Sequence, residues 1–135
     1  MIFVRLHGVE DLTRKLDPMV VDQPLRAFLV RVSESIRSHA REATPVDVGR
    51  LRNSLAYEIL EGHPPPGARV GTNVVYAPFV HEGTRPHFPP PKALAKWSRR
   101  HGLPSPWPVA VAIARRGTKA RRFLRDGVSA ASPQF

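Results

Sequence analysis

Two histidines and a glutamate lie near one another in the sequence, at His81, Glu82 and His87. Imidazole and carboxylate groups are common zinc ligands. A His-Glu pair also opens the helical motif in which a second His, four residues after the first, completes a metal site. Here that position is Arg85, and Gly83 would interrupt the helix that has to present both ligands. The motif is incomplete, so a metal enzyme using these three side chains is kept only as a third hypothesis.

A short glycine motif near the other end of the chain resembles part of a phosphate-binding loop. The loop pattern requires Gly-Lys-Ser/Thr, whereas Gly117 is followed by Thr118 and only then by Lys119. Similar tripeptides begin at Gly71 and Gly83, but their flanks differ, and we interpret all three as unrelated turns. The chain also has no Cys, no nucleophile elbow and no obvious pair of carboxylates. We therefore expect no enzyme activity, no bound metal and no cofactor.

Positive charge is the strongest chemical signal. The chain has 21 Lys and Arg against 11 Asp and Glu, a formal net charge of +10. Residues 1–84 contain ten of each sign, whereas residues 85–135 contain eleven basic side chains and a single acid, Asp126. Such a segment suits nucleic acid, an acidic protein, or plain solvation. A non-specific DNA-binding protein is our alternative function, and it would use Lys92, Lys96, Arg99, Arg100, Arg115, Arg116, Lys119, Arg121, Arg122 and Arg125.

Aromatic residues give this alternative little support. They make up 7% of the chain, and no row of them alternates with the basic residues to form a stacking platform. Trp97 and Trp107 have apolar or proline neighbours, and we expect both to lie in the core.

Length and composition predict a single domain over residues 1–135. The chain has 135 residues, of which 41% are apolar, which is enough for an ordinary core. Its apolar runs fall short of the roughly 20 residues that a membrane span requires, and we expect no membrane association. The absence of Cys excludes a disulfide framework and suits a reducing compartment.

The first half of the chain should contain one long helix. We predict a strand over residues 2–6, a short helix over residues 9–16, and the long helix from about residue 23 or 24 to 43. An apolar stripe at helical spacing supports the last of these, formed by Leu25, Phe28, Leu29, Val32, Ile36 and Ala40. Thr44 is predicted to be the N-cap of another short helix, with Pro45 at its first position and Asp47 at its positive end, before Gly49.

The second half should contain a hairpin followed by short helices. Strands are predicted over residues 54–60 and 68–76, and residues 77–83 are ambiguous. Helices are predicted over residues 92–101 and 108–116, the first with its cations on one side and Leu94 and Trp97 on the other. Residues 121–131 form either a strand or a short helix. The predicted fold class is α+β, a small antiparallel sheet packed against one long helix and several short helices.

Four stretches of the chain, taken in order, resemble a known family. They are residues 43–55, residues 70–84, residues 88–91 leading to Trp97, and residues 113–119 with Phe123 and Leu124. Together they are similar to the minor tail or tail-completion proteins of long-tailed phages, the lambdoid protein Z and head–tail joining family. The resemblance covers about residues 25–128.

The resemblance implies a structural protein of the virion, at the neck or the top of the tail, assembled in the cytoplasm of the bacterial host. It implies a ring of identical subunits, a hexamer or a dodecamer, in contact with adjacent neck and tail proteins. For the basic segment it offers two alternative partners, DNA in the channel or the acidic surface of a neighbouring protein. No catalysis and no cofactor are implied. Candidate interface residues are Arg50, Arg52, Asn53, Lys92, Lys96, Arg99, Arg100, Arg115, Arg116, Lys119 and Arg122. Candidate turn and fold residues are Thr44, Pro45, Asp47, Gly49, Gly71, Tyr76, Gly83, Thr84 and Gly117.

Overall fold

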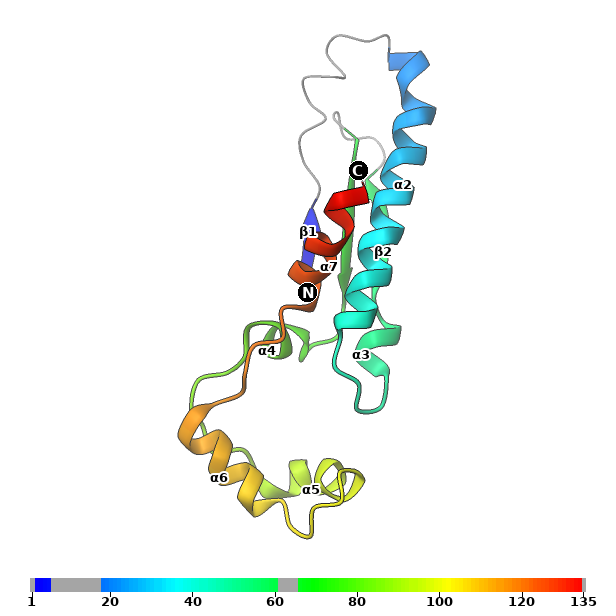
Figure 1. The fold of residues 1–135 in the computed structure, drawn as a ribbon. Helices are drawn as coiled ribbons and strands as arrows, with labels where there is room; N and C mark the ends of the chain where they lie inside the picture. Colours follow the sequence, from blue (N-terminus) through cyan, green and yellow to red (C-terminus); the bar gives the residue numbers. More distant parts are fainter. Residues whose placement is uncertain (1, 6–17, 61–65, 135) are drawn as a thin grey trace. The chain divides into compact units, whose positions relative to one another are not determined.

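The computed structural model describes residues 2–5, 18–60 and 66–134, and only the backbone of residues 18–21 and 134. The fold is α+β, as predicted, with a three-stranded antiparallel sheet and several helices (Figure 1). The chain divides into two compact units: unit 1 comprises Met1–Ala77 and Phe123–Phe135, and unit 2 comprises Pro78–Arg122. The predicted helix over residues 9–16 lies outside the described residues.

Unit 1 combines the sheet with two helices that pack against each other. Its elements are β1 (Ile2–Arg5), α2 (Pro18–Ala43), α3 (Arg50–Asn53), β2 (Ala56–Leu60), β3 (Gly67–Thr72), α7 (Phe123–Ala131) and a final 3-10 turn (Ser132–Gln134). The strand order is β1-β3-β2, and both pairings are antiparallel. The predicted hairpin is confirmed, since β2 and β3 pair directly. Residues 121–131, for which the sequence allowed either a strand or a short helix, contain the helix α7.

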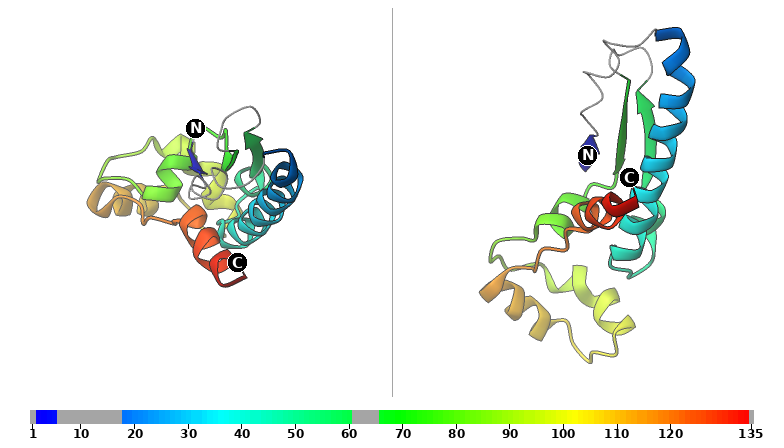
Figure 2. Two further views of the ribbon diagram at one scale, coloured as in Figure 1. Left: turned by 90° about the horizontal axis from the view of Figure 1, so that it is seen from above. Right: turned by 45° about the horizontal axis from the view of Figure 1, so that its top comes forward.

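The core of unit 1 lies between one face of the sheet and the helices. Strand β3 alternates strictly, so that Ala68, Val70 and Thr72 are buried and their neighbours are not. Val70 packs with α2 and α7, and Ala68 packs with the preceding part of α2. Helix α2 runs alongside the sheet, as the two views in Figure 2 show. The opposite face of the sheet carries the side chains that alternate with these, such as the exposed Phe3 and the partly exposed Arg69.

The long helix is confirmed but begins earlier than predicted. It starts at Pro18, which places Pro24 inside the helix rather than at its beginning. Proline has the helical φ and removes only one donor, so a helix can continue through it when packing further along compensates. The apolar stripe supplies that packing, because Leu29 and Ile36 are almost fully buried.

Thr44 does not begin a new helix, which corrects our prediction. Its hydroxyl donates to the carbonyl of Ala40 at 2.6 Å, so Thr44 satisfies a free carbonyl at the end of α2. The next helix, α3, begins only at Arg50, with Gly49 as its N-cap at a φ of 76° and no side-chain cap. Pro45 and Asp47 therefore lie in the connection between the two helices.

The strands are shorter than predicted because turns begin inside the expected ranges. Ser54 donates to the carbonyl of Leu51 at the end of α3, and β2 begins two residues later. After β3, the backbone N–H of Val74 donates to the hydroxyl of Thr72, which bends the chain. Tyr76 consequently lies in a turn. Gly71, predicted to be in a turn, instead lies in β3, where a Cβ would meet the carbonyl oxygen of Ile2 at 2.3 Å.

Candidate interaction surface

Unit 2 is built around a crossing of its two ends. Thr84 and Thr118 form an antiparallel bridge, with backbone hydrogen bonds of 3.2 Å in both directions. Their hydroxyls lie 3.0 Å apart, and the N–H of Thr118 also donates to the hydroxyl of Thr84 at 3.1 Å. The N–H of Arg121 donates to the carbonyl of Val80 at 2.9 Å. These bonds join segments that lie more than thirty residues apart in the sequence.

Two of the three glycine tripeptides form this crossing, so our interpretation of them as unrelated turns was wrong. Gly83 and Gly117 both have a positive φ, of 75° and 71°. A Cβ on Gly83 would meet the carbonyl oxygen of Thr118 at 2.4 Å, and one on Gly117 would meet that of Thr84 at 1.9 Å. Each glycine thus makes room for the backbone of the other tripeptide.

Between the two ends of the crossing, unit 2 carries two helices of ten residues. They are α5 (Pro91–Arg100) and α6 (Trp107–Arg116), and both begin with proline at the first or second position. The shorter α4 (Ala77–Glu82) starts at the end of unit 1 and precedes Gly83. The ambiguous segment is therefore a helix, and the helices predicted over residues 92–101 and 108–116 are confirmed with small shifts.

The cations of α5 are all exposed on one side of the helix, as their spacing predicted. Leu94 and Trp97 are only partly exposed, and Trp97 stacks on His101 with ring centroids 4.1 Å apart. Other basic residues of unit 2 are also exposed, namely Arg85, Arg115, Arg116, Lys119, Arg121 and Arg122. Unit 2 contains ten basic side chains and one acid, Glu82. Nearly the whole excess positive charge of the chain therefore belongs to unit 2.

Trp107 is not a core residue, which corrects our expectation. Its side chain is 58% exposed at the start of α6, beside Phe88, which is 53% exposed. Pro106 and Pro108, which flank it, lie at the start of the helix. Trp97, the other tryptophan, is half-buried. The apolar neighbours in the sequence therefore misled the prediction for Trp107.

The three residues of the metal hypothesis do not form a metal site. His81 is nearly buried and its Nδ1 donates to the carboxylate of the adjacent Glu82 at 2.8 Å. The Nδ1 of His87 donates instead to the carbonyl of Arg85 at 2.9 Å. Within the described part of the chain, no group of three or more His, Asp or Glu side chains is arranged to hold a metal.

Arg50, Arg52 and Asn53 lie on the short helix α3 of unit 1, and all three are exposed. They are adjacent to the α2–α3 connection, where Val46 and Val48 are also exposed. This surface therefore combines guanidinium groups with apolar side chains. Its role as an interface stays a prediction.

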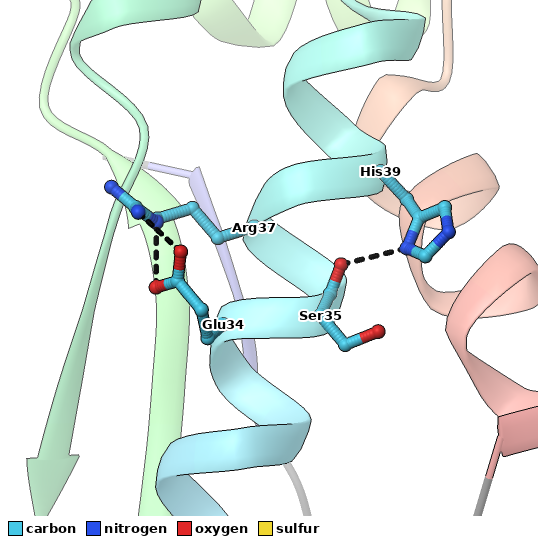
Figure 3. Close-up of polar contacts among 4 residues, drawn as sticks. All are labelled: Glu34, Ser35, Arg37 and His39. Atoms are coloured by element: carbon cyan, nitrogen blue, oxygen red, sulfur yellow. Dashed lines mark hydrogen bonds and ion pairs between the residues drawn. The ribbon is translucent and has the colours of Figure 1, made fainter.

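Two polar contacts of α2 join residues within that helix (Figure 3). Arg37 forms a two-pronged ion pair with Glu34, one turn earlier, and this hydrogen bonding raises the pKa of Arg37 above its usual value. The Nδ1 of His39 donates to the carbonyl of Ser35 at 2.8 Å. Arg37 also lies over the ring of Tyr57, 5.9 Å from its centroid. These contacts support the helix rather than a ligand site.

An open depression of about 240 Å³ lies on the outer face of the sheet in unit 1. Phe3 and Arg69 contribute to its lining, and the guanidinium of Arg69 lies 4.8 Å from the centroid of the Phe3 ring. The Nε of Arg69 is buried without a hydrogen-bond partner among the described residues. Among the described residues that line this depression, no other side chain has a buried polar atom without a hydrogen-bond partner.

None of the described helices combines the length and apolar character that a membrane crossing requires. Comparisons with models of protein families, with curated proteins and with solved structures give no match. The candidate surfaces therefore rest on the residues of this chain alone.

Proposed function

We propose that this chain is a structural protein of the junction between head and tail of a long-tailed phage, where it completes the tail or connects it to the neck. Identical subunits assemble into a ring that contacts adjacent neck and tail proteins. The motifs over residues 43–55 and 70–84 suggested this role, and the concentration of positive charge and the exposed apolar side chains of unit 2 support it.

The observation that carries the proposal is the surface of unit 2. Unit 1 has a core of buried apolar side chains, whereas the buried residues of unit 2 are only His81, Ser98 and Ala110. The Phe79, Phe88 and Trp107 rings of unit 2 are exposed, in a unit that also carries ten basic side chains. An apolar and charged surface of this kind is typical of a region that a partner covers on assembly.

A closed ring requires two different surfaces on each subunit. Heterologous contacts join one patch to a different, complementary patch on the neighbour. The α3 surface, with Arg50 and Arg52, supplies one candidate in unit 1, and the basic helix α5 supplies another in unit 2. Because both are basic, they do not pair with each other, and each requires an acidic patch on a neighbour. Arginine suits such contacts because its guanidinium makes several hydrogen bonds at fixed angles.

Electron microscopy of assembled particles tests the proposal. Density for this chain at the neck or the top of the tail, repeated around the particle axis, is the expected result. Density elsewhere in the particle, or its absence from particles that carry complete tails, would contradict it. Mass measurement of the isolated ring gives the number of subunits.

Charge reversal at α3 provides a matched test of the interface. Arg50→Glu combined with Arg52→Glu should reduce the yield of tailed particles by about tenfold or more, because like charges replace complementary ones at the contact. Arg31→Glu is the control, since Arg31 is exposed on α2 away from α3. Equal yields from the double variant and the control would contradict a role for α3.

The exposed cations of unit 2 also favour non-specific DNA binding as a second candidate. That function predicts an affinity for duplex DNA that falls steeply with salt, in proportion to the phosphates neutralised. A duplex that fails to bind even at low salt would remove it. We favour contact with proteins, because a strongly basic channel wall would retain DNA that has to be ejected.

A further inference from the structure

Three exposed apolar side chains share one patch on unit 2. Phe88 and Trp107 have their ring centroids 5.9 Å apart, at an angle of 47°. Val111 follows Trp107 by one helical turn on α6 and is 38% exposed. We call Phe88, Trp107 and Val111 the Trp107 patch.

Hydrogen bonds from two backbone N–H groups hold the patch in place. The N–H of His87 donates to the carbonyl of Ile113, at 3.4 Å, which ties the extended segment before Phe88 to α6. The N–H of Trp107 donates to the hydroxyl of Ser105 at 3.3 Å, at the start of the same helix. The rings are therefore presented by an ordered backbone, which lowers the entropic cost of binding.

Positive charge continues the patch along α6. Arg115 is four residues beyond Val111 and eight beyond Trp107, so the three share one exposed face of the helix. One helical face thus changes from aromatic to aliphatic to cationic over about two turns. Elsewhere in unit 2 the basic residues outnumber the single acid, Glu82.

We propose that the Trp107 patch docks an acidic polypeptide segment with apolar anchors, whose carboxylates face Arg115 and the other cations of unit 2. Charge complementarity determines the acidic character of the partner. Aromatic side chains and Arg are the residues that carry most binding energy at protein interfaces. The docked segment belongs to a neighbouring protein in the assembly, so the inference deepens the proposed function and rests on it.

The geometry favours protein over nucleic acid as the occupant. The Phe88 and Trp107 rings are tilted against each other rather than spaced to enclose a base. Val111 adds an aliphatic contact that a base plane does not need.

The test uses the full chain and a labelled synthetic peptide that forms an amphipathic helix, with leucine on one face and glutamate on the other. Binding is followed by fluorescence anisotropy at low and moderate salt. The acidic peptide should bind, and Trp107→Ala should weaken it by about tenfold or more. Trp107→Phe should restore most of the affinity, because it keeps an aromatic ring.

Two controls separate docking from folding and from general charge attraction. Val75→Ala removes an apolar side chain that is 86% exposed in unit 1, and it should leave the affinity unchanged. The same peptide with lysine in place of glutamate should not bind. Circular dichroism of each variant checks that the fold is kept.

Three results would overturn the proposal. The first is an affinity for the acidic peptide that Trp107→Ala leaves unchanged, and the second is equal binding of the lysine peptide. The third is a short DNA duplex that displaces the acidic peptide and whose own binding is lost in Trp107→Ala. The peptide experiment needs no particle, so its failure is distinct from the failure of the proposed function, which particle density at another location would show.

Discussion

At the scale of single residues, the crossing of Gly83-Thr84 with Gly117-Thr118 is the most constrained feature of unit 2. Each glycine has a positive φ, and each would place a Cβ against the backbone of the opposite tripeptide. Gly117 has a ψ of −160°, a backbone conformation that is essentially restricted to glycine. Both the conformation and the space therefore require glycine.

We predict that Gly117→Ala destabilises the protein by about 3 kcal/mol or more, since it adds backbone strain to a clash with the carbonyl of Thr84. Gly102→Ala is the matched control. Gly102 has a similar φ of 70°, but a Cβ there would meet nothing within 4 Å. Gly102→Ala should therefore lower the free energy of unfolding by only about 1 kcal/mol.

Urea unfolding, followed by circular dichroism, measures both changes. Equal losses for the two variants would mean that the close approach at the crossing contributes nothing to stability.

Sequence reasoning found these glycines but missed their relation. It identified the tripeptides at Gly83 and Gly117 as similar and interpreted them as separate turns. A glycine in a local sequence pattern indicates that a turn with a positive φ is allowed there. The pairing of Thr84 with Thr118 depends instead on how the chain between them folds, which a local pattern does not show. The exposure of Trp107 was missed for the same reason, because its neighbours Pro106 and Pro108 are apolar in sequence but begin a helix in space.

At the scale of elements, the packing of α7 on α2 completes unit 1. Gly127 is the point of closest approach, where a Cβ would lie 2.8 Å from the Cβ of Ala40 and 2.9 Å from the carbonyl oxygen of Ile36. Small residues on both helices allow the backbones to come this close. Phe123 and Leu124, at the start of α7, are almost completely buried.

Gly127→Ala should therefore separate the two helices and cost about 1–3 kcal/mol, although alanine is the better helix former. Ser129→Ala, on the exposed side of α7, gives the same residue without the clash and should change stability by less than about 0.5 kcal/mol. Thermal unfolding of the two variants makes the comparison. A Gly127→Ala variant as stable as the original would contradict the close packing.

The elements themselves could be predicted to different extents. The stripe from Leu25 to Ala40 predicted α2 because an amphipathic helix repeats its own period in the sequence. α7 was left open as strand or helix, since nine residues containing Gly127 and Ser129 have little intrinsic preference, and packing on α2 decides the outcome. Thr44 was assigned to the wrong helix because its hydroxyl can satisfy either end of a helix.

At the scale of the whole molecule, the net charge of +10 is concentrated in one stretch of sequence rather than spread over the chain. Unit 2 has nine more basic than acidic side chains, and unit 1 is almost neutral. Counting charged residues along the sequence already placed the excess of basic side chains after residue 84. The exposure of the cations on α5 followed from their helical spacing.

Repulsion among these cations predicts that salt stabilises the isolated protein. Raising sodium chloride from about 20 to about 200 mM should increase the melting temperature, because screening lengths shorten to below about 10 Å. The double variant Lys96→Glu and Arg99→Glu should show a weaker dependence, since it lowers the net charge of unit 2 by four. Calorimetry at several salt concentrations measures this. A melting temperature that falls with salt would contradict net repulsion.

Unit 1 is formed by two stretches of the chain that unit 2 separates in the sequence, and this order affects its folding during synthesis. Its sheet and long helix are made first, but α7 is translated only after all of unit 2. Until the ribosome has passed Ala131, the nascent chain lacks the complete helix that covers Ile36 and Val70, and those side chains remain open to chaperones and proteases. A message truncated anywhere within unit 2 would therefore yield an unfinished core in unit 1.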